Sequence, residues 1–181
     1  MLVVAATALE LALIQGVDTL CCGIGPVEAS IVTARALAAR GHSAVLHIGI
    51  AGARNLDPPA LVLGSESIYC DLIDSRSKLP RIERQTPDPA LLEAAIAALP
   101  GVAVMPIATS ARVGGGDCAD VEAMEGFGVL RAAALASVPA VELRAISNLV
   151  GESDRSRWRI QEALELLANA AIDVIEALER G

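Results

Sequence analysis

Short apolar runs of the β type alternate along the chain with stretches whose apolar residues recur at helical spacing. The runs cover residues 2–6, 19–22, 43–48, 60–70, 102–108 and 140–147, and the 60–70 run holds one or two strands. Gly25 with Pro26 suits the start of a helix, and Arg40 with Gly41 suits its end. The alternation predicts an α/β protein, a three-layer α/β/α sandwich around a mostly parallel or mixed central sheet.

The helical stretches differ in length. A brief one ends near Ile14, and longer ones cover residues 26–40, 88–100, 122–137 and 158–178. In the 26–40 helix one face is shared by Val27, Ile31, Ala34 and Ala38. The last helix carries one apolar stripe of Ile160, Leu164, Leu167, Ala171, Val174 and Leu178, with Glu165, Asp173 and Glu176 away from it. We expect it to cover one face of the sheet, and we expect surface loops at 71–87 and 112–120.

Composition limits the class of protein. The chain has 181 residues, of which 54% are hydrophobic and 20% charged, so disorder is excluded and residues 1–181 are expected to form a single domain. Its net charge of −8 argues against a nucleic-acid partner. No basic segment precedes the first apolar stretch, which Glu10 interrupts, and Pro100 and Pro106 break the longest uncharged run. We therefore expect a cytoplasmic protein with no membrane partner.

The cysteines and histidines do not have the spacing of a metal site. They are Cys21, Cys22, Cys70, Cys118, His42 and His47, with no C-x-x-C pattern among them. We expect the thiols to be buried and reduced, and we expect neither a metal nor a cofactor. His47 lies within an apolar run, where a histidine is most often structural.

Polar residues follow several of the predicted strands. They form clusters at 7–10, 23–25, 49–52 and 147–148, and a fifth cluster at 122–126 enters a helix with two carboxylates. Ligands of open α/β sheets bind beyond the carboxyl ends of the strands. These clusters therefore predict a crevice for a small molecule.

The order of two motifs resembles a known superfamily. Residues 121–126 (VEAMEG), followed by 144–148 (RAISN), resemble the purine nucleoside phosphorylase and nucleosidase superfamily, and residues 146–158 (ISNLVGESDRSRW) look most like its futalosine hydrolase branch. The resemblance implies an N-ribosyl hydrolase that splits futalosine into hypoxanthine and dehypoxanthinyl futalosine during menaquinone synthesis. It also implies the superfamily sandwich in a shortened form, a purine nucleoside as partner, and a homodimer.

The resemblance assigns roles on the ribose side of the site. Glu10 would orient and deprotonate the attacking water, Glu125 would accept hydrogen bonds from the ribose hydroxyls, and Met124 would pack against the sugar. Departure of a purine passes through an oxocarbenium-like transition state, which needs an activated water on one face and hydrogen bonding to the leaving base. Further substrate-binding residues by resemblance are Ile50, Ala51, Gly52 and Glu122.

Asn148 is the second catalytic residue that the resemblance implies. Its neutral amide offers donors to N7 and O6 of a 6-oxopurine, whereas the Asp of adenine-specific relatives accepts from an exocyclic amine, so Asn148 favours hypoxanthine. Ser147 would steady this loop. Trp158 matches the place of an aromatic that some relatives bring over the substrate.

Other interpretations stay open. Glu10 is also compatible with a solvated charge, Glu125 with an ion pair to Arg144, and Glu122 with ion pairs to Arg155 or Arg157. The alternative functions are a 5'-methylthioadenosine/S-adenosylhomocysteine nucleosidase and a noncatalytic purine-binding relative. A phosphorylase would need cations near the ribose, and the chain has no Arg or Lys before Arg35.

Overall fold

The computed structural model of the chain describes residues 1–72 and 79–180. Within these residues the strands are β1 (Leu2–Ala5), β2 (Asp18–Cys21), β3 (Val45–Ala53), β4 (Ala60–Tyr69), β5 (Arg84–Gln85), β6 (Ala103–Thr109), β7 (Val121–Ala123) and β8 (Ala140–Leu149). The helices are α1 (Ala8–Leu11), α2 (Pro26–Ala39), α3 (Pro89–Ala98), α4 (Gly126–Leu135) and α5 (Ile160–Arg180), with a 3₁₀ turn at Arg155–Arg157.

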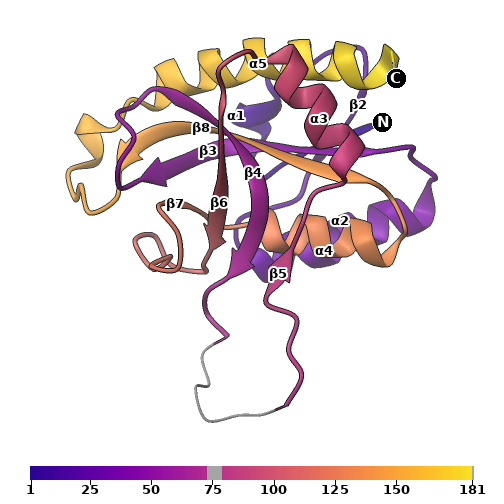
Figure 1. The fold of residues 1–181 in the computed structure, drawn as a ribbon, viewed down its shortest axis with the longest axis horizontal. Coiled ribbons are helices and arrows are strands. Elements are labelled where there is room, and N and C mark those ends of the chain that lie inside the picture. The colour runs from indigo at the N-terminus through magenta and orange to yellow at the C-terminus, as the bar shows by residue number, and fades with distance from the viewer. Residues whose placement is uncertain (73–78, 181) are drawn as a thin grey trace.

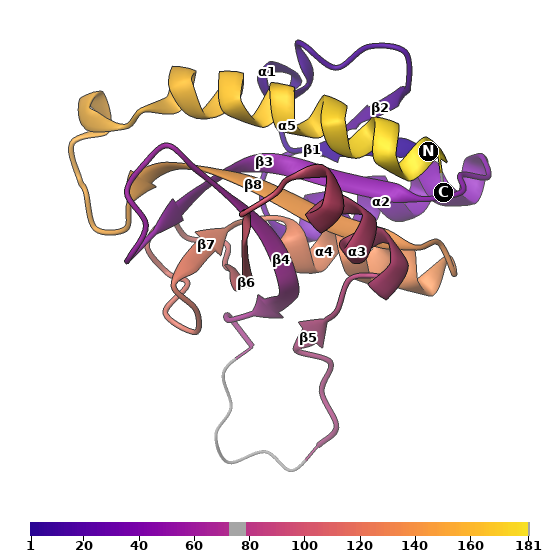
Figure 2. The ribbon, with the colours of Figure 1, turned by 45° about the horizontal axis from the view of Figure 1, so that its top comes forward.

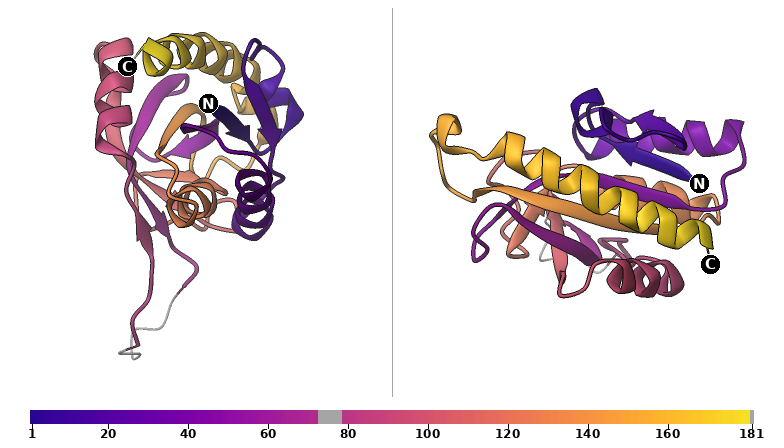
Figure 3. Two further views of the ribbon diagram at one scale, coloured as in Figure 1. Left: turned by 90° about the vertical axis from the view of Figure 1, so that its right-hand side faces the viewer. Right: turned by 90° about the horizontal axis from the view of Figure 1, so that it is seen from above.

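The strands form one mixed sheet that curls into a closed circuit. β3 pairs in parallel with β1 and β8, and β8 pairs antiparallel with β4. β4 continues in parallel to β6, β6 to β7, and β7 returns antiparallel to β3. Helices α1, α3 and α5 lie on one side, and α2 and α4 on the other (Figures 1 and 3). The predicted three layers and mixed sheet are confirmed, and the closure is an addition that the apolar pattern does not show.

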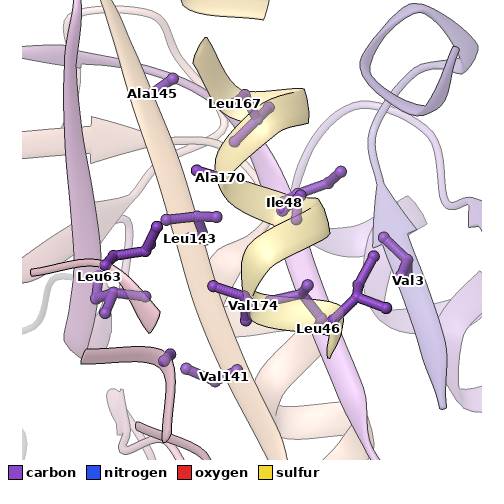
Figure 4. Close-up of a cluster of buried hydrophobic side chains, with 14 of the residues drawn as sticks. Val3, Leu46, Ile48, Leu63, Val141, Leu143, Ala145, Leu167, Ala170 and Val174 are labelled. Atoms are coloured by element: carbon purple, nitrogen blue, oxygen red, sulfur yellow. The ribbon is translucent and has the colours of Figure 1, made fainter. Parts of the chain in front are cut away.

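Helix α5 covers one face of the sheet, as its apolar stripe predicts. It runs across β3 and β8 (Figure 2). Its side chains Leu167 and Val174 are buried with Leu46, Ile48 and Leu143 in the largest apolar cluster (Figure 4). Each fully buried Leu or Val contributes roughly 1.5–3 kcal/mol relative to an exposed one. Neither α5 nor any other helix of the described residues is long and apolar enough to cross a bilayer.

Helix α2 turns inward a different face from the predicted one, which Val27 and Ile31 mark. Val27 and Ile31 are 66% and 59% exposed. The buried residues of the helix are Pro26, Ala29, Thr33 and Leu37. The reason is close packing on α4, because a Cβ on Gly128 would lie 2.6 Å from the carbonyl oxygen of Pro26 and 2.6 Å from Ser30 Oγ. Such an approach between backbones requires small residues on the packed face.

Three predicted boundaries move. Strand β3 continues through Gly49 and Gly52, which the sequence places after the strand, and β8 continues through Asn148. The stretch expected as one helix over 122–137 is instead strand β7 followed by α4. Of the predicted loop 71–87, residues 73–78 lie outside the described part of the chain, and β5 interrupts the remainder.

The expectation of four buried, reduced thiols is wrong. Cys70 and Cys118 form a disulfide, with Cα atoms 6.1 Å apart, and Cys21 is exposed, whereas Cys22 is buried and free. β4 and β6 pair in parallel, so Cys70 at the end of β4 lies beside the loop that follows β6. The two residues are 48 positions apart, and the pairing of β4 with β6 brings them together.

Candidate active site

Glu10 is held by its own helix start and by β3. Thr7 caps α1, and its backbone N–H and hydroxyl both donate to Oε2 of Glu10, at 2.9 and 2.8 Å. The N–H of Ile50 donates to Oε1 at 3.0 Å. The side chain is 8% exposed, so the interpretation as a solvated surface charge is wrong. Three donors leave the carboxylate fixed in direction.

Arg144 occupies the centre of the site, although the sequence analysis gives it no catalytic role. It stands on β8 opposite Gly49 of β3 and is fully buried. Its Nε donates to Glu142 at 2.8 Å, whereas its buried Nη1 has no hydrogen-bond partner among the described residues. A Cβ on Gly49 would lie 2.1 Å from Nη1 and 3.0 Å from Oε1 of Glu10. The missing side chain at Gly49 therefore lets the Glu10 carboxylate and the Arg144 guanidinium lie close together.

Glu125 faces the same centre from the start of α4. Its Oε2 lies 3.8 Å from Nη1 of Arg144, and its Oε1 accepts a hydrogen bond from the N–H of Gly25 at 3.0 Å. Burial raises the pKa of this carboxyl, and the charge of Arg144 partly opposes the rise. The ion pair expected as the alternative is present. This ion pair keeps the Glu125 carboxylate near Glu10, where it can also accept hydrogen bonds from a bound ligand.

A second polar group lies around Gly52, further along β3. A Cβ on Gly52 would lie 3.1 Å from Nδ2 of Asn148 and 3.6 Å from Cγ of Glu122. The Ser147 hydroxyl donates to Oδ1 of Asn148 at 2.8 Å, and Nδ2 donates to the carbonyl of Leu149 at 3.1 Å. Asn148 is thereby oriented, with one of its two N–H groups left for a ligand.

Glu122 is held by the glycine loop and not by the arginines that the sequence suggests. Gly114 and Gly116 donate their N–H groups to its two oxygens at 2.6 and 3.2 Å, and Arg54 lies 3.9 Å away. The expected ion pair with Arg155 or Arg157 is therefore wrong. Arg157 instead pairs with Glu152 at 3.1 Å.

The remaining predicted residues are Ile50, Ala51, Met124 and Trp158. Ile50 and Met124 are half-buried, and the carbonyl oxygen of Ala51 lies 3.3 Å from the Ser147 hydroxyl, which donates its hydrogen to Asn148 at the shorter distance of 2.8 Å. The Trp158 indole donates to the carbonyl of Glu152 at 3.0 Å, and its ring lies 5.3 Å from the Arg155 guanidinium. These contacts lie within its own loop.

Tyr69 and Phe127 form a stacked aromatic pair that the sequence analysis does not anticipate. Their ring centroids lie 5.4 Å apart, and the N–H of Phe127 donates to Thr109 Oγ1 at 2.9 Å. The pair borders the start of α4, two residues from Glu125. Among residues 1–72 and 79–180 no group of three or more His, Cys, Asp or Glu is arranged to hold a metal.

Comparison with known proteins identifies the family of the chain. The Phosphorylase superfamily profile matches residues 15–112. A futalosine hydrolase of Streptomyces coelicolor is 36% identical over 194 aligned residues, which cover 91% of this chain and 81% of that protein. One of Thermus thermophilus is 46% identical over 52 residues, 29% of this chain and 23% of that protein.

Solved structures share the fold. A futalosine hydrolase mutant of Helicobacter pylori superposes with a TM-score of 0.88 at 17% identity, over 97% of both chains. A 5'-methylthioadenosine/S-adenosylhomocysteine nucleosidase from Neisseria meningitidis superposes with a TM-score of 0.82 at 20% identity, over 97% of this chain and 98% of that one. The resemblance seen in the motifs is confirmed: the chain belongs to the phosphorylase superfamily and, within it, to the futalosine hydrolase family.

Proposed function

We propose that this chain is an N-ribosyl hydrolase that cleaves futalosine to hypoxanthine and dehypoxanthinyl futalosine, as a step of menaquinone synthesis. The observation that carries the proposal is the pair of buried groups at Gly49, the Oε1 of Glu10 and the unpartnered Nη1 of Arg144. A carboxylate and a guanidinium N–H that face one point can hold a water, one as acceptor and the other as donor. That is the arrangement a hydrolase needs.

Glu10 acts as the general base in this proposal. It takes a proton from the water as the water oxygen bonds to the anomeric carbon, and the glycosidic bond breaks with its electron pair leaving on the purine. Glu125, on the other side of Arg144, accepts hydrogen bonds from the ribose hydroxyls. Three N–H or O–H donors fix Glu10, so its carboxylate does not have to reorganise during the reaction.

Asn148 selects the base. Residues 49 and 52 are three positions apart on β3, roughly 10 Å along a strand, so a nucleoside can place its sugar at one group and its purine at the other. The free N–H of Asn148 then donates to O6 or N7 of the purine. Because an amide cannot give up a proton, the departing base is protonated by solvent.

The decisive experiment offers futalosine, inosine and 5'-methylthioadenosine to the purified protein and follows the free base by chromatography. We expect hypoxanthine from futalosine at the highest kcat/KM. Glu10→Gln should lower kcat by ~100-fold or more, the usual scale of general base catalysis. Glu93→Gln, an exposed position on α3, is the matched control. Adenine as the main product would favour the methylthioadenosine nucleosidase, and binding of hypoxanthine without turnover would favour a noncatalytic relative.

We further propose that the chain is a cytoplasmic homodimer. Exposed apolar side chains occur on and after α1, at Leu9 and Leu13, and before and on α2, at Ile24, Val27 and Ile31. The apolar side chains at the start of α2, namely Ile24, Val27 and Ile31, suit an isologous contact with a second copy, in which the same face is used twice. Val27→Glu with Ile31→Glu should give a monomer in sedimentation analysis. Ile172→Glu on α5 should leave the dimer intact, and a monomeric parent protein would refute the proposal.

A further inference from the structure

Four fully buried polar side chains form a hydrogen-bonded chain across the sheet and end on the reaction centre. They are His47 on β3, Ser67 on β4, and Glu142 and Arg144 on β8. The proposed hydrolysis uses only the Nη1 of Arg144. The other three residues have no assigned role, and each is an expensive group to bury without a partner.

The donor and acceptor of each hydrogen bond can be assigned by starting where the chain of side chains meets β1, at Val4. The Nδ1 of His47 lies 3.0 Å from the carbonyl oxygen of Val4, which only accepts, so Nδ1 carries the proton. The Nε2 of His47 is then the acceptor for Nη2 of Arg144, with which it is in contact. Burial lowers the pKa of His47 well below its ordinary value, which keeps the ring neutral. One edge of the guanidinium is thereby fixed.

Glu142 fixes a second nitrogen of the guanidinium, Nε. Its Oε1 accepts from Nε of Arg144 at 2.8 Å, and its Oε2 accepts from the hydroxyl of Ser67. A Cβ on Gly126 would lie 2.4 and 2.5 Å from these two oxygens, so the carboxylate is pressed against the backbone at the start of α4. The carboxylate of Glu142 is therefore held in one position, and so is Nε of Arg144, which donates a hydrogen bond to it.

Without Glu142, the guanidinium of Arg144 would have a more favourable set of hydrogen bonds than those seen in the structure. Arginine prefers to donate two parallel hydrogen bonds to a carboxylate, and both Glu10 and Glu125 face Arg144. Rotation into such a pair would occupy the place of the water and block the base. With Nε on Glu142 and Nη2 on His47, only Nη1 reaches the centre.

We infer that Glu142 is a positioning residue for the proposed hydrolysis: it holds Nε of Arg144 so that only Nη1, with its two N–H groups, points between Glu10 and Glu125. The inference rests on the proposed function for its kinetic consequence and on the hydrogen-bonded chain for its geometry. His47 and Ser67 hold the two ends of the same arrangement.

The test is a double-mutant cycle on futalosine hydrolysis. Glu142→Met keeps the volume and loses the acceptor, and should lower kcat at least 10-fold with less than a 3-fold change in KM. Glu142→Gln keeps a carbonyl acceptor for Nε and should recover at least a third of kcat. Arg144→Met should also lower kcat, and the double variant should lie within 3-fold of Arg144→Met alone, because Glu142 acts through Arg144. Glu66→Met on β4, which breaks the ion pair of Glu66 with Arg84 of β5, is the matched control.

Several results would overturn the inference. The ion pair would be merely structural if the losses of kcat in the double variant were additive, or if Glu142→Gln lost as much as Glu142→Met. The same would follow if the loss of kcat tracked the thermal stability of each variant. If Glu142→Met does not fold, Ser67→Ala with and without Arg144→Met gives the same cycle, with a ~3-fold effect expected at the outer hydrogen bond.

Crystal structures separate this inference from the proposed function. In Glu142→Met the guanidinium should leave the Gly49 position and pair with Glu10 or Glu125, and in Glu142→Gln it should stay. If the parent protein releases no base but the guanidinium moves as expected, the proposed function fails and the positioning role stands. If the parent protein is active and the guanidinium stays in place in Glu142→Met, the positioning role fails alone.

Discussion

Asn148 is the residue whose substitution tests base selection most directly. Ser147 and Leu149 fix its amide, leaving one N–H for O6 or N7 of a purine. Asn148→Asp would place an ionised acceptor against these acceptors, so kcat/KM for futalosine should fall by about 10-fold or more, the cost of one unpaired polar contact. The ratio of kcat/KM for futalosine to that for 5'-methylthioadenosine is the measurement. An unchanged ratio would remove Asn148 as the selector.

Glu125 should give the reaction a pH dependence of its own. Burial raises the pKa of this carboxyl above its ordinary 4.5, although Arg144 and the N–H of Gly25 oppose the rise. As the pH falls toward the raised pKa, Glu125 takes up a proton and loses an acceptor for the ribose hydroxyls. KM should therefore rise at a higher pH than an ordinary glutamate would give, and Glu125→Gln should show a high KM that no longer varies with pH.

The sign of the effect on stability is the opposite of the sign for binding. Because the folded protein holds the Glu125 proton more tightly than the unfolded chain, the contribution of this group to folding is full below pH 4.5 and is lost as the pH rises through the folded pKa. Thermal unfolding of the parent protein and of Glu125→Gln across this range measures the difference. A difference that grows in the other direction would mean that Glu125 is ionised more readily in the fold than outside it.

At the scale of elements, local signals predict some segments well and others not at all. Asp88 caps the start of helix α3, where its side chain accepts from the N–H groups of Ala90 and Leu91, and the helix ends before Pro100. Local residues therefore determine both of its ends. Strand β7 has no such local cause. It is three residues long and exists because β3 and β6 pair with it on either side.

The candidate site shows the same division. Glu10, Glu125 and Asn148 are found from motifs, since each lies in a short stretch that resembles its family. Arg144 lies in one of those motifs, and a guanidinium within an apolar strand is a signal that it has buried partners, yet its partners come from other strands. Glu142 and the Gly49 position that admits Nη1 depend on the register of β3 with β8, which sequence spacing alone does not give.

The disulfide ties two elements that frame the site. Cys70 directly follows β4, and Cys118 lies in the loop whose Gly114 and Gly116 donate to Glu122. Closing a loop with a separation of 48 residues should contribute about 4 kcal/mol, or about 10 °C in Tm for a chain of this length. The Tm should fall by this amount in reductant, and Cys118→Ser should have the low Tm in both conditions. Cys21→Ser is the control. If the Tm of the parent protein is the same with and without reductant, the prediction is contradicted.

At the scale of the whole molecule, the closed circuit of strands explains why distant motifs converge. Gly49 and Gly52 lie on β3, which pairs with β8 along one edge and with β7 along the other. β8 carries Arg144 and Asn148, and β7 carries Glu122 just before α4 begins. Strand β3 thus brings Glu10 together with Arg144 and Asn148, from two distant parts of the sequence.

The charge around this centre decides between hydrolysis and phosphorolysis. The absence of Arg and Lys before Arg35 does not leave the site without a cation, because β8 supplies Arg144. That single guanidinium, however, already faces Glu10, Glu125 and Glu142, and the N–H of Gly25 at the start of α2 is taken by Glu125. A dianionic phosphate would meet an excess of negative charge.

The reaction should therefore remain a hydrolysis when phosphate is abundant. The start of α2 could attract an anion by ~0.3 to 1 kcal/mol, which is too little to offset the carboxylates around Arg144. In excess phosphate, futalosine should still give the free ribose compound, with phosphate at most a weak competitor. Mass spectrometry of the sugar product is the measurement, with Glu10→Gln in the same buffer as control. A ribose 1-phosphate product would mean that phosphate displaces the water held by Glu10 and Arg144, and that Glu10 is not its base.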